Sequence, residues 1–186
     1  MFLISKPSRP KIDKFIENAR STEFSYLEVG ASRDNPPATY NIDENRILLA
    51  ADFETAKAAI RSWKMFGLKW VDICWPATPI EVGQTVAVLV NHLEFYSLNA
   101  ARIVYVTDEA NRFGFAYGTL LDHSESGEER FMVEIDPLTG EVWYELFAFS
   151  RPGHLFAKLG YPYARMLQKQ FAIDSLAAMK RAVDAC

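Results

Sequence analysis

The chain has little cysteine and no apolar run long enough to cross a membrane. Its two cysteines are Cys74 and Cys186, and no CxxC pair occurs. This usage is not that of a disulfide framework or a zinc module, and it suits a reducing compartment. The opening Met1–Ile4 is too short an apolar run for a signal peptide, and a membrane span needs about 20 apolar residues. We expect a cytoplasmic protein without a membrane span.

The chain also has no excess of positive charge. Its formal net charge is −4, which argues against nucleic acid as a partner, because phosphate binding needs clustered Lys and Arg. One basic stretch runs from Lys6 to Arg20, but Asp13 and Glu17 are interleaved in it. A solvated helix face is the better interpretation of that stretch.

Signature motifs of common chemistry are missing as well. No GxSxG, Walker-type or GxGxxG pattern occurs, so neither a hydrolase elbow nor nucleotide binding has support. The three histidines, His92, His123 and His154, are far apart, and none has a metal-ligand neighbour at helical or loop spacing. We predict no metal and no cofactor, and no catalytic residue can be assigned.

Aromatic residues, in contrast, are abundant, with 13 Phe, 8 Tyr and 4 Trp. Such side chains either fill a core or line an apolar pocket. A length of 186 residues favours one core. The loop at Arg33–Pro37, whose prolines cannot enter a helix interior, predicts an N-terminal extension with a short helix over residues 1–39 and one domain over residues 40–186.

Hydrophobic periodicity predicts an α+β fold. A short helix is expected around Ile12–Ala19, then a strand over Arg46–Ala50, then a helix from Asp52 to about Phe66. Short connections between the next strands imply an antiparallel meander. These strands are expected near Trp70–Cys74, Thr85–Leu93, Ala100–Thr107, Arg112–Leu120, Glu129–Asp136 and Glu141–Phe149. A helix from Pro162 to Val183, about 33 Å long, ends the chain.

This order of elements matches the helix-grip arrangement, in which a curved antiparallel sheet of about seven strands wraps around a long C-terminal helix. Folds of this kind often leave an apolar cavity between sheet and helix. The candidate cavity residues are Trp70, Tyr105, Phe115, Tyr117, Trp143, Glu145, Phe147 and Phe171. Which strand face points inward stays open, because a one-residue register error exchanges the two sets.

Two strands carry further signals. Gly114 and Gly118 alternate with aromatic residues, which indicates either close approach of another backbone or a sharp bend of the sheet. Glu145 lies among aromatic residues. Either it pairs with an arginine of a neighbouring strand, such as Arg130 or Arg102, or it carries a raised pKa in a pocket.

The densest polar cluster lies in and after the hairpin at residues 122–130. Its candidate members are His123, Glu128, Glu129, Arg130 and Arg151. A histidine beside carboxylates can serve as a general base, although a charge-rich hairpin is more often merely solvated. Arg151 either binds an anion in bidentate fashion or holds the strand end to Glu128 or Glu129.

Several segments resemble one family, and the resemblance runs from about Tyr40 to Val183. They are Trp63–Phe66, Ser97–Val106, Arg112–Leu120, Gly127–Phe131, Ala148–Pro152, Gly160–Pro162 and Gln168–Met179. The family is domain of unknown function 1990, also called uncharacterised protein family 0548. It is similar to the Bet v 1/START-like superfamily of helix-grip proteins, which bind or cyclise lipids, hormones or polyketides. The chain departs from the family at Leu49–Asp52, where relatives usually show glycines.

The resemblance carries no settled activity, so three functions stay open. The first is binding of a hydrophobic small molecule, lipid- or polyketide-like, in the cavity. The second is a cyclase- or hydrolase-like enzyme that acts on such a molecule, which predicts ionisable groups converging inside the pocket. The third is a protein–protein interaction module. The oligomeric state is not predicted.

Overall fold

The computed structural model describes residues 1–121, 125–152 and 161–185. The strands are β1 Phe2–Leu3, β2 Asn41–Leu49, β3 Val71–Cys74, β4 Thr85–Asn91, β5 Tyr96–Asp108, β6 Arg112–Thr119, β7 Glu125–Ile135 and β8 Val142–Pro152. The helices are α1 Arg9–Ala19, α2 Phe53–Arg61, a short 3-10 helix η1 Lys64–Phe66 and α4 Tyr161–Asp184.

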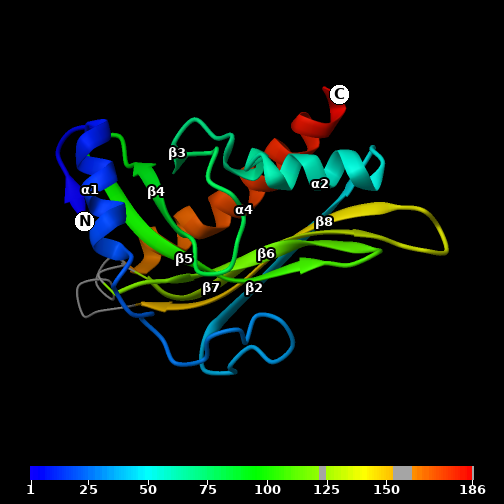
Figure 1. The fold of residues 1–186 in the computed structure, drawn as a ribbon, viewed down its shortest axis with the longest axis horizontal. Coiled ribbons are helices and arrows are strands. Elements are labelled where there is room, and N and C mark those ends of the chain that lie inside the picture. The colour runs from blue at the N-terminus through cyan, green and yellow to red at the C-terminus, as the bar shows by residue number, and fades with distance from the viewer. Residues whose placement is uncertain (122–124, 153–160, 186) are drawn as a thin grey trace.

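All strands join one antiparallel sheet in the order β2-β8-β7-β6-β5-β4-β3, and β1 pairs with the start of β5. The meander from β3 to β8 follows the chain, and β2 adds to the edge of β8. Helices α2 and α4 both lie over one face of this sheet, and the chain from α1 to β2 runs beneath the other (Figure 1). The predicted fold class, an α+β helix grip around the C-terminal helix, is confirmed. We call the face under α4 the inner face and the opposite one the outer face.

Several predicted elements had wrong bounds, and the strands expected from Ala100 and Glu129 begin four residues earlier, at Tyr96 and Glu125. The helix expected to run to Phe66 ends at Arg61, because Trp63 takes the left-handed conformation with a φ of 55°. This turn buries the indole of Trp63, whose Nε1 donates to the carbonyl of Thr78 at 2.9 Å. The strand expected from Arg46 begins five residues earlier, at Asn41.

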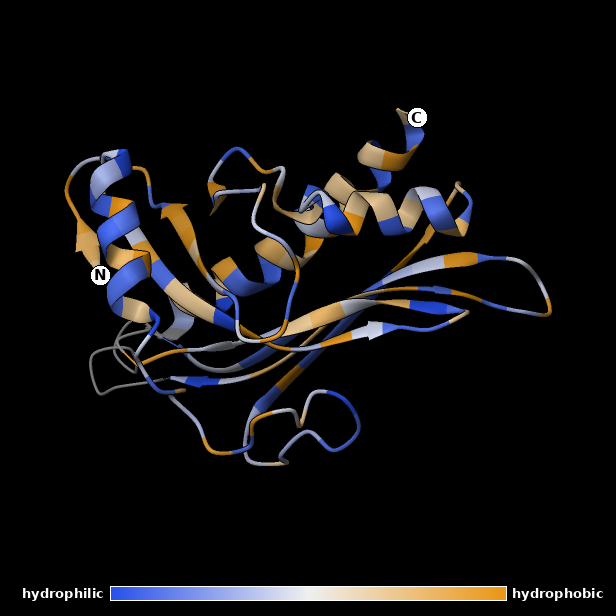
Figure 2. Ribbon diagram, viewed as in Figure 1, coloured by the Kyte–Doolittle hydropathy of each residue, from blue (hydrophilic) through white to orange (hydrophobic). Residues whose placement is uncertain are grey.

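The core lies on the inner face, at the end of the sheet covered by α2 and η1. Phe115 and Phe131 pair across β6 and β7, and both are fully buried against Trp63 or Phe66. Both helices over this face carry interspersed hydrophobic and hydrophilic residues (Figure 2), so each buries one side. Within the described ranges, no helix combines the length and apolar character that crossing a bilayer requires.

Two arginines fix the N-terminal segment to the outer face. Arg102 on β5 donates from Nη2 to three carbonyls, those of Ala19, Arg20 and Thr22, at 2.8 to 3.0 Å. It therefore satisfies carbonyls that the end of α1 leaves without helical partners. Arg130 on β7 donates to the carbonyl of Ser32.

Glu128 supplies the complementary anion beside these arginines. Its carboxylate accepts the backbone N–H groups of Gly30 at 2.6 Å and Ser32 at 2.9 Å, and the residue is only 2% exposed. Hydrogen bonds to a charged acceptor are stronger than neutral ones. The outer face of the sheet is therefore covered by the N-terminal segment, and its charged side chains bind the backbone of that segment.

Close backbone approach, one of the two expected reasons for the β6 glycines, holds at Gly114, whereas side chains approach Gly118. A Cβ on Gly114 would lie 2.1 Å from the carbonyl oxygen of Phe131, and one on Gly118 would lie 2.0 Å from the Tyr26 hydroxyl. Close approach by a neighbouring strand at the first position, and by the N-terminal segment at the second, requires glycine there.

We expect Glu128→Ala to lower the free energy of unfolding by about 3 kcal/mol, because the buried N–H of Ser32 and the half-buried N–H of Gly30 lose a charged acceptor. Glu134→Ala, at an exposed position of the same strand, is the control and should change it by less than about 0.5 kcal/mol. Urea unfolding followed by circular dichroism measures both. Equal effects of the two substitutions would show that the Glu128 contacts stabilise nothing.

Candidate functional site

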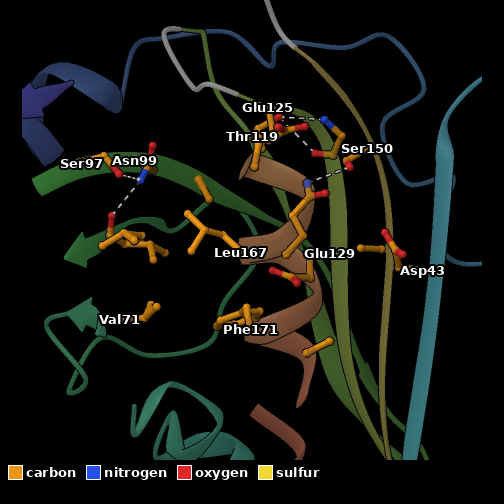
Figure 3. A pocket seen from close by; sticks show the side chains of 18 of the residues that line it. Asp43, Val71, Ser97, Asn99, Thr119, Glu125, Glu129, Ser150, Leu167 and Phe171 are labelled. Atoms are coloured by element: carbon orange, nitrogen blue, oxygen red, sulfur yellow. Dashed lines mark hydrogen bonds between the residues drawn. The ribbon is translucent and has the colours of Figure 1, made fainter. Parts of the chain in front are cut away.

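A cavity of about 430 Å³ lies between the inner face of the sheet and α4. Its walls come from β2, from β3 to β8 and from the first half of α4. Figure 3 shows Asp43 and Glu129 on one side of this space, Ser97 and Asn99 on the other, and Leu167 and Phe171 of α4 between them. The volume falls within the range of about 300 to 1,000 Å³ typical of small-molecule sites.

The cavity exists because inward-facing side chains become smaller along the strands. On β8 the inner face carries Tyr144 and Leu146 in the core, then Ala148 and Ser150 at the cavity. On β5 the inward-facing side chains change from Ile103 in the core to Ala101, Asn99 and Ser97 at the cavity. One end of the sheet is thus packed against α2, whereas the other leaves space beneath α4.

The cavity lining is mainly apolar. Phe66, Trp70, Val71, Leu167 and Phe171 are among its residues. Trp70 is held by a hydrogen bond of 2.8 Å from its indole Nε1 to the carboxylate of Asp174 on α4. Such a lining favours an occupant with a hydrocarbon or aromatic body.

Ionisable groups converge at the wall formed by β2, β7 and α4. Arg165 donates to both carboxylate oxygens of Asp43, at 2.5 and 2.7 Å, and to Gln168 at 2.7 Å. Gln168 in turn donates to the Ser150 hydroxyl at 3.1 Å. This bidentate ion pair joins the edge strand β2 to α4 at that wall.

Glu129 lies next to that ion pair, and it faces the cavity from the middle of β7. The Tyr117 hydroxyl donates to its Oε2 at 2.6 Å. Burial raises the pKa of Glu129 to about 7, the hydrogen bond from Tyr117 acts in the opposite direction, and the charge of Asp43 raises it further. Glu129 can therefore hold or release a proton near neutral pH.

A second polar group lies at the opposite wall. The His92 ring contacts the Ser97 hydroxyl at 2.8 Å and the Tyr163 hydroxyl at 3.3 Å, and it stacks on Phe95. Burial lowers the pKa of His92, which favours the neutral ring at pH 7. The cavity thus has one acidic wall and one neutral polar wall.

Three of the eight predicted cavity residues border this space, namely Trp70, Tyr117 and Phe171. Phe115 shares their face but is packed into the core. The remaining four lie on the outer face and need correction. Trp143, Glu145 and Phe147 alternate with the inward-facing residues of β8. Tyr105 is displaced by a β-bulge between Ile103 and Tyr105, and its hydroxyl contacts that of Ser32.

The structure decides between the alternatives for Glu145 and shows where Arg151 lies. Glu145 forms an ion pair with Arg130 of β7, which is the pairing alternative. The guanidinium of Arg151 lies over the Tyr40 ring, 4.5 Å from its centroid. Among the described residues, no ion pair joins this arginine to Glu128 or Glu129.

The predicted polar cluster does not form one site. Glu128 and Arg130 face outward, whereas Glu129 faces the cavity, because consecutive strand residues point to opposite faces. His123 lies outside the described residues. Across the ranges described, no group of three or more His, Cys, Asp or Glu side chains could hold a metal ion.

Sequence reasoning missed Asp43, Glu125, Arg165 and Gln168. The stretch Asn41–Arg46 is polar at almost every position, so its inward-facing Asp43 gave no alternation signal. On α4, Arg165 and Gln168 lie three residues apart beside the apolar Leu167 and Phe171. Polar residues on the otherwise apolar stripe of a helix were the available signal.

The sequence and fold together place the chain in a family. Residues 25–178 match the family described as Domain of unknown function (DUF1990). The chain belongs to this family, whose members also carry the name UPF0548. A UPF0548 protein of Dictyostelium discoideum is 37% identical, and the match covers 98% of this chain and 96% of the relative. A UPF0548 protein of Deinococcus radiodurans is 35% identical over 92% of this chain and 93% of its own.

Solved structures show the same fold at low identity. The crystal structure of TTHA0849 from Thermus thermophilus has a TM-score of 0.54 and 12% identity, and the match covers 78% of this chain and 98% of that one. A solution structure of a protein from Arthrobacter aurescens has a TM-score of 0.54 and 11% identity over 78% and 87% of the two chains.

The raised pKa of Glu129 predicts a pH-dependent stability. Glutamate ordinarily titrates near 4.5, but Glu129 titrates near 7 in the folded protein. Between these values the folded state keeps a proton that the unfolded state has lost, so this group makes stability fall as pH rises. Glu129→Gln should therefore be more stable than the wild type by about 3 kcal/mol at pH 8 and nearly equal to it at pH 4.

Urea unfolding at the two pH values measures this difference. Glu134→Gln, exposed on the same strand, is the matched control and should follow the wild type at both. If the free energy of unfolding of Glu129→Gln differs from that of the wild type by the same amount at pH 4 and pH 8, the raised pKa of Glu129 is contradicted.

Proposed function

We propose that the protein binds a small, mainly apolar molecule in the cavity between the sheet and α4. The observation that carries this proposal is a cavity of about 430 Å³ with a predominantly hydrocarbon and aromatic lining. Burying apolar ligand surface there is favourable by roughly 25 cal/mol per Å².

The arrangement of polar groups supports binding of a ligand with a polar end. The ion pair of Asp43 with Arg165, and Glu129 beside it, lie on one wall of an otherwise apolar space. A few convergent polar groups in an apolar pocket orient a ligand and provide specificity. The ligand is therefore expected to be amphipathic.

A second candidate function, an enzyme acting on the bound molecule, is favoured by one observation. Glu129, with a pKa of about 7, faces the cavity and accepts a hydrogen bond from Tyr117. Such a carboxyl group can serve as a general acid or base near neutral pH. Chemical change of a bound compound that depends on Glu129 would favour this function over binding alone.

Binding is tested with N-phenyl-1-naphthylamine, a weakly basic and essentially uncharged fluorophore whose emission rises in apolar surroundings. We expect saturable binding with one site per chain. Ala148→Phe places a ring in the cavity from the inner face of β8 and should weaken binding at least tenfold. Ala110→Phe, at an exposed loop position, is the control and should bind like the wild type.

Native mass spectrometry of the gently purified protein provides a second readout. We expect an additional mass that leaves on collisional activation and that is reduced in Ala148→Phe. The absence of any bound mass, together with fluorophore binding that Ala148→Phe does not change, would count against a binding cavity.

A further inference from the structure

The charges around the cavity constrain the polar end of the ligand. Among the described residues that line it, the acidic side chains are Asp43, Glu125, Glu128 and Glu129, and there is no Lys or Arg. Glu128 is used elsewhere, because its carboxylate binds the N-terminal loop on the outer face. The groups left on the inner face give the cavity an acidic wall.

The nearby arginine neutralises Asp43, and its charge also acts on Glu125, but it forms no ion pair with Glu129. Arg165 is engaged in the bidentate pair with Asp43. No ion pair joins Glu129 to a cation within the described ranges; the hydrogen bond that it accepts comes from the uncharged Tyr117 hydroxyl. An ionised carboxylate in an apolar space without a cationic partner is costly, so a cation supplied by a ligand would be stabilised there.

The aromatic lining favours the same kind of charge. Phe66, Trp70, Tyr117 and Phe171 all border the cavity, and aromatic faces attract ammonium groups. Figure 3 draws both Glu129 and Phe171 among the side chains that line this space. A carboxylate and aromatic rings around one apolar volume form a recognition site for an organic cation.

From these observations we propose that the ligand is a lipophilic amine, with its protonated nitrogen at Glu129 and its apolar body against Phe66, Trp70 and Phe171. This inference rests on the proposed binding function and adds the chemical class of the ligand. A ligand carboxylate is disfavoured at Glu129, because the ionised form of this residue would repel it. A neutral alcohol can donate a hydrogen bond to Glu129 but brings no positive charge.

The groups that face Glu129 determine how binding depends on pH. They are Asp43 on β2, Tyr117 on β6, Glu125 on β7, Tyr144 on β8 and Arg165 on α4. The two tyrosines stay neutral near pH 7, since burial raises their pKa. An ammonium group displaces the proton of Glu129, so amine binding near pH 7 should release protons.

The test compares three probes with one apolar body, 4-phenylbutylamine, 4-phenylbutan-1-ol and 4-phenylbutanoate, by isothermal titration calorimetry on the full chain at pH 7. We expect the amine to bind at least tenfold more tightly than either the alcohol or the carboxylate. Glu129→Gln should weaken amine binding about tenfold and change alcohol binding less than threefold. Glu134→Gln should leave both unchanged.

Proton release gives a readout on the wild type that does not depend on how a variant folds. Titrations of the amine in two buffers of different ionisation enthalpy should show release of a fraction of a proton at pH 7 and almost none at pH 9. Equal affinities for amine and alcohol, or absence of proton release, would overturn the amine proposal. If N-phenyl-1-naphthylamine still binds in that case, the cavity-binding function stands; if it does not, both fail.

Discussion

The register of the antiparallel sheet is the constraint on which the rest of the structure depends. Side chains alternate between two faces, so each pairing decides which residues meet α4 and which meet the N-terminal segment. On β8, Ala148 and Ser150 face the helix, whereas Phe147 and Phe149 join the cluster beneath the N-terminal segment. A shift by one residue would fill the cavity with aromatic rings.

Two adjacent glutamates on β7 show how this alternation gives neighbouring residues different surroundings. Glu128 faces outward and binds two backbone N–H groups of the N-terminal loop, so its charge stabilises the fold. Glu129 faces inward, borders the cavity and has a pKa of about 7. The same residue type thus anchors a segment on one face and places an acidic group at the cavity on the other.

Much of the fold could be predicted because the hydrophobic residues of each element repeat with the period of its secondary structure. The strands of the meander and the final helix are examples. The site was harder to predict. Inward and outward sets on β8 are both apolar, so its pattern did not select Ala148 over Phe147. The prediction for Tyr105 was wrong because a β-bulge shifts this residue, and no residue type in the sequence indicates a bulge there. The pair of Asp43 with Arg165 joins residues 122 positions apart, which only the folded chain brings together.

If the space beneath α4 is a ligand site, it should hold a small amine in a crystal. The decisive experiment is a crystal structure of the protein grown with 4-phenylbutylamine. We expect density for the phenyl ring against Phe171 and for the nitrogen within hydrogen-bonding distance of the Glu129 carboxylate. A cavity closed by its own side chains, with the compound absent or bound only on the surface, would contradict it.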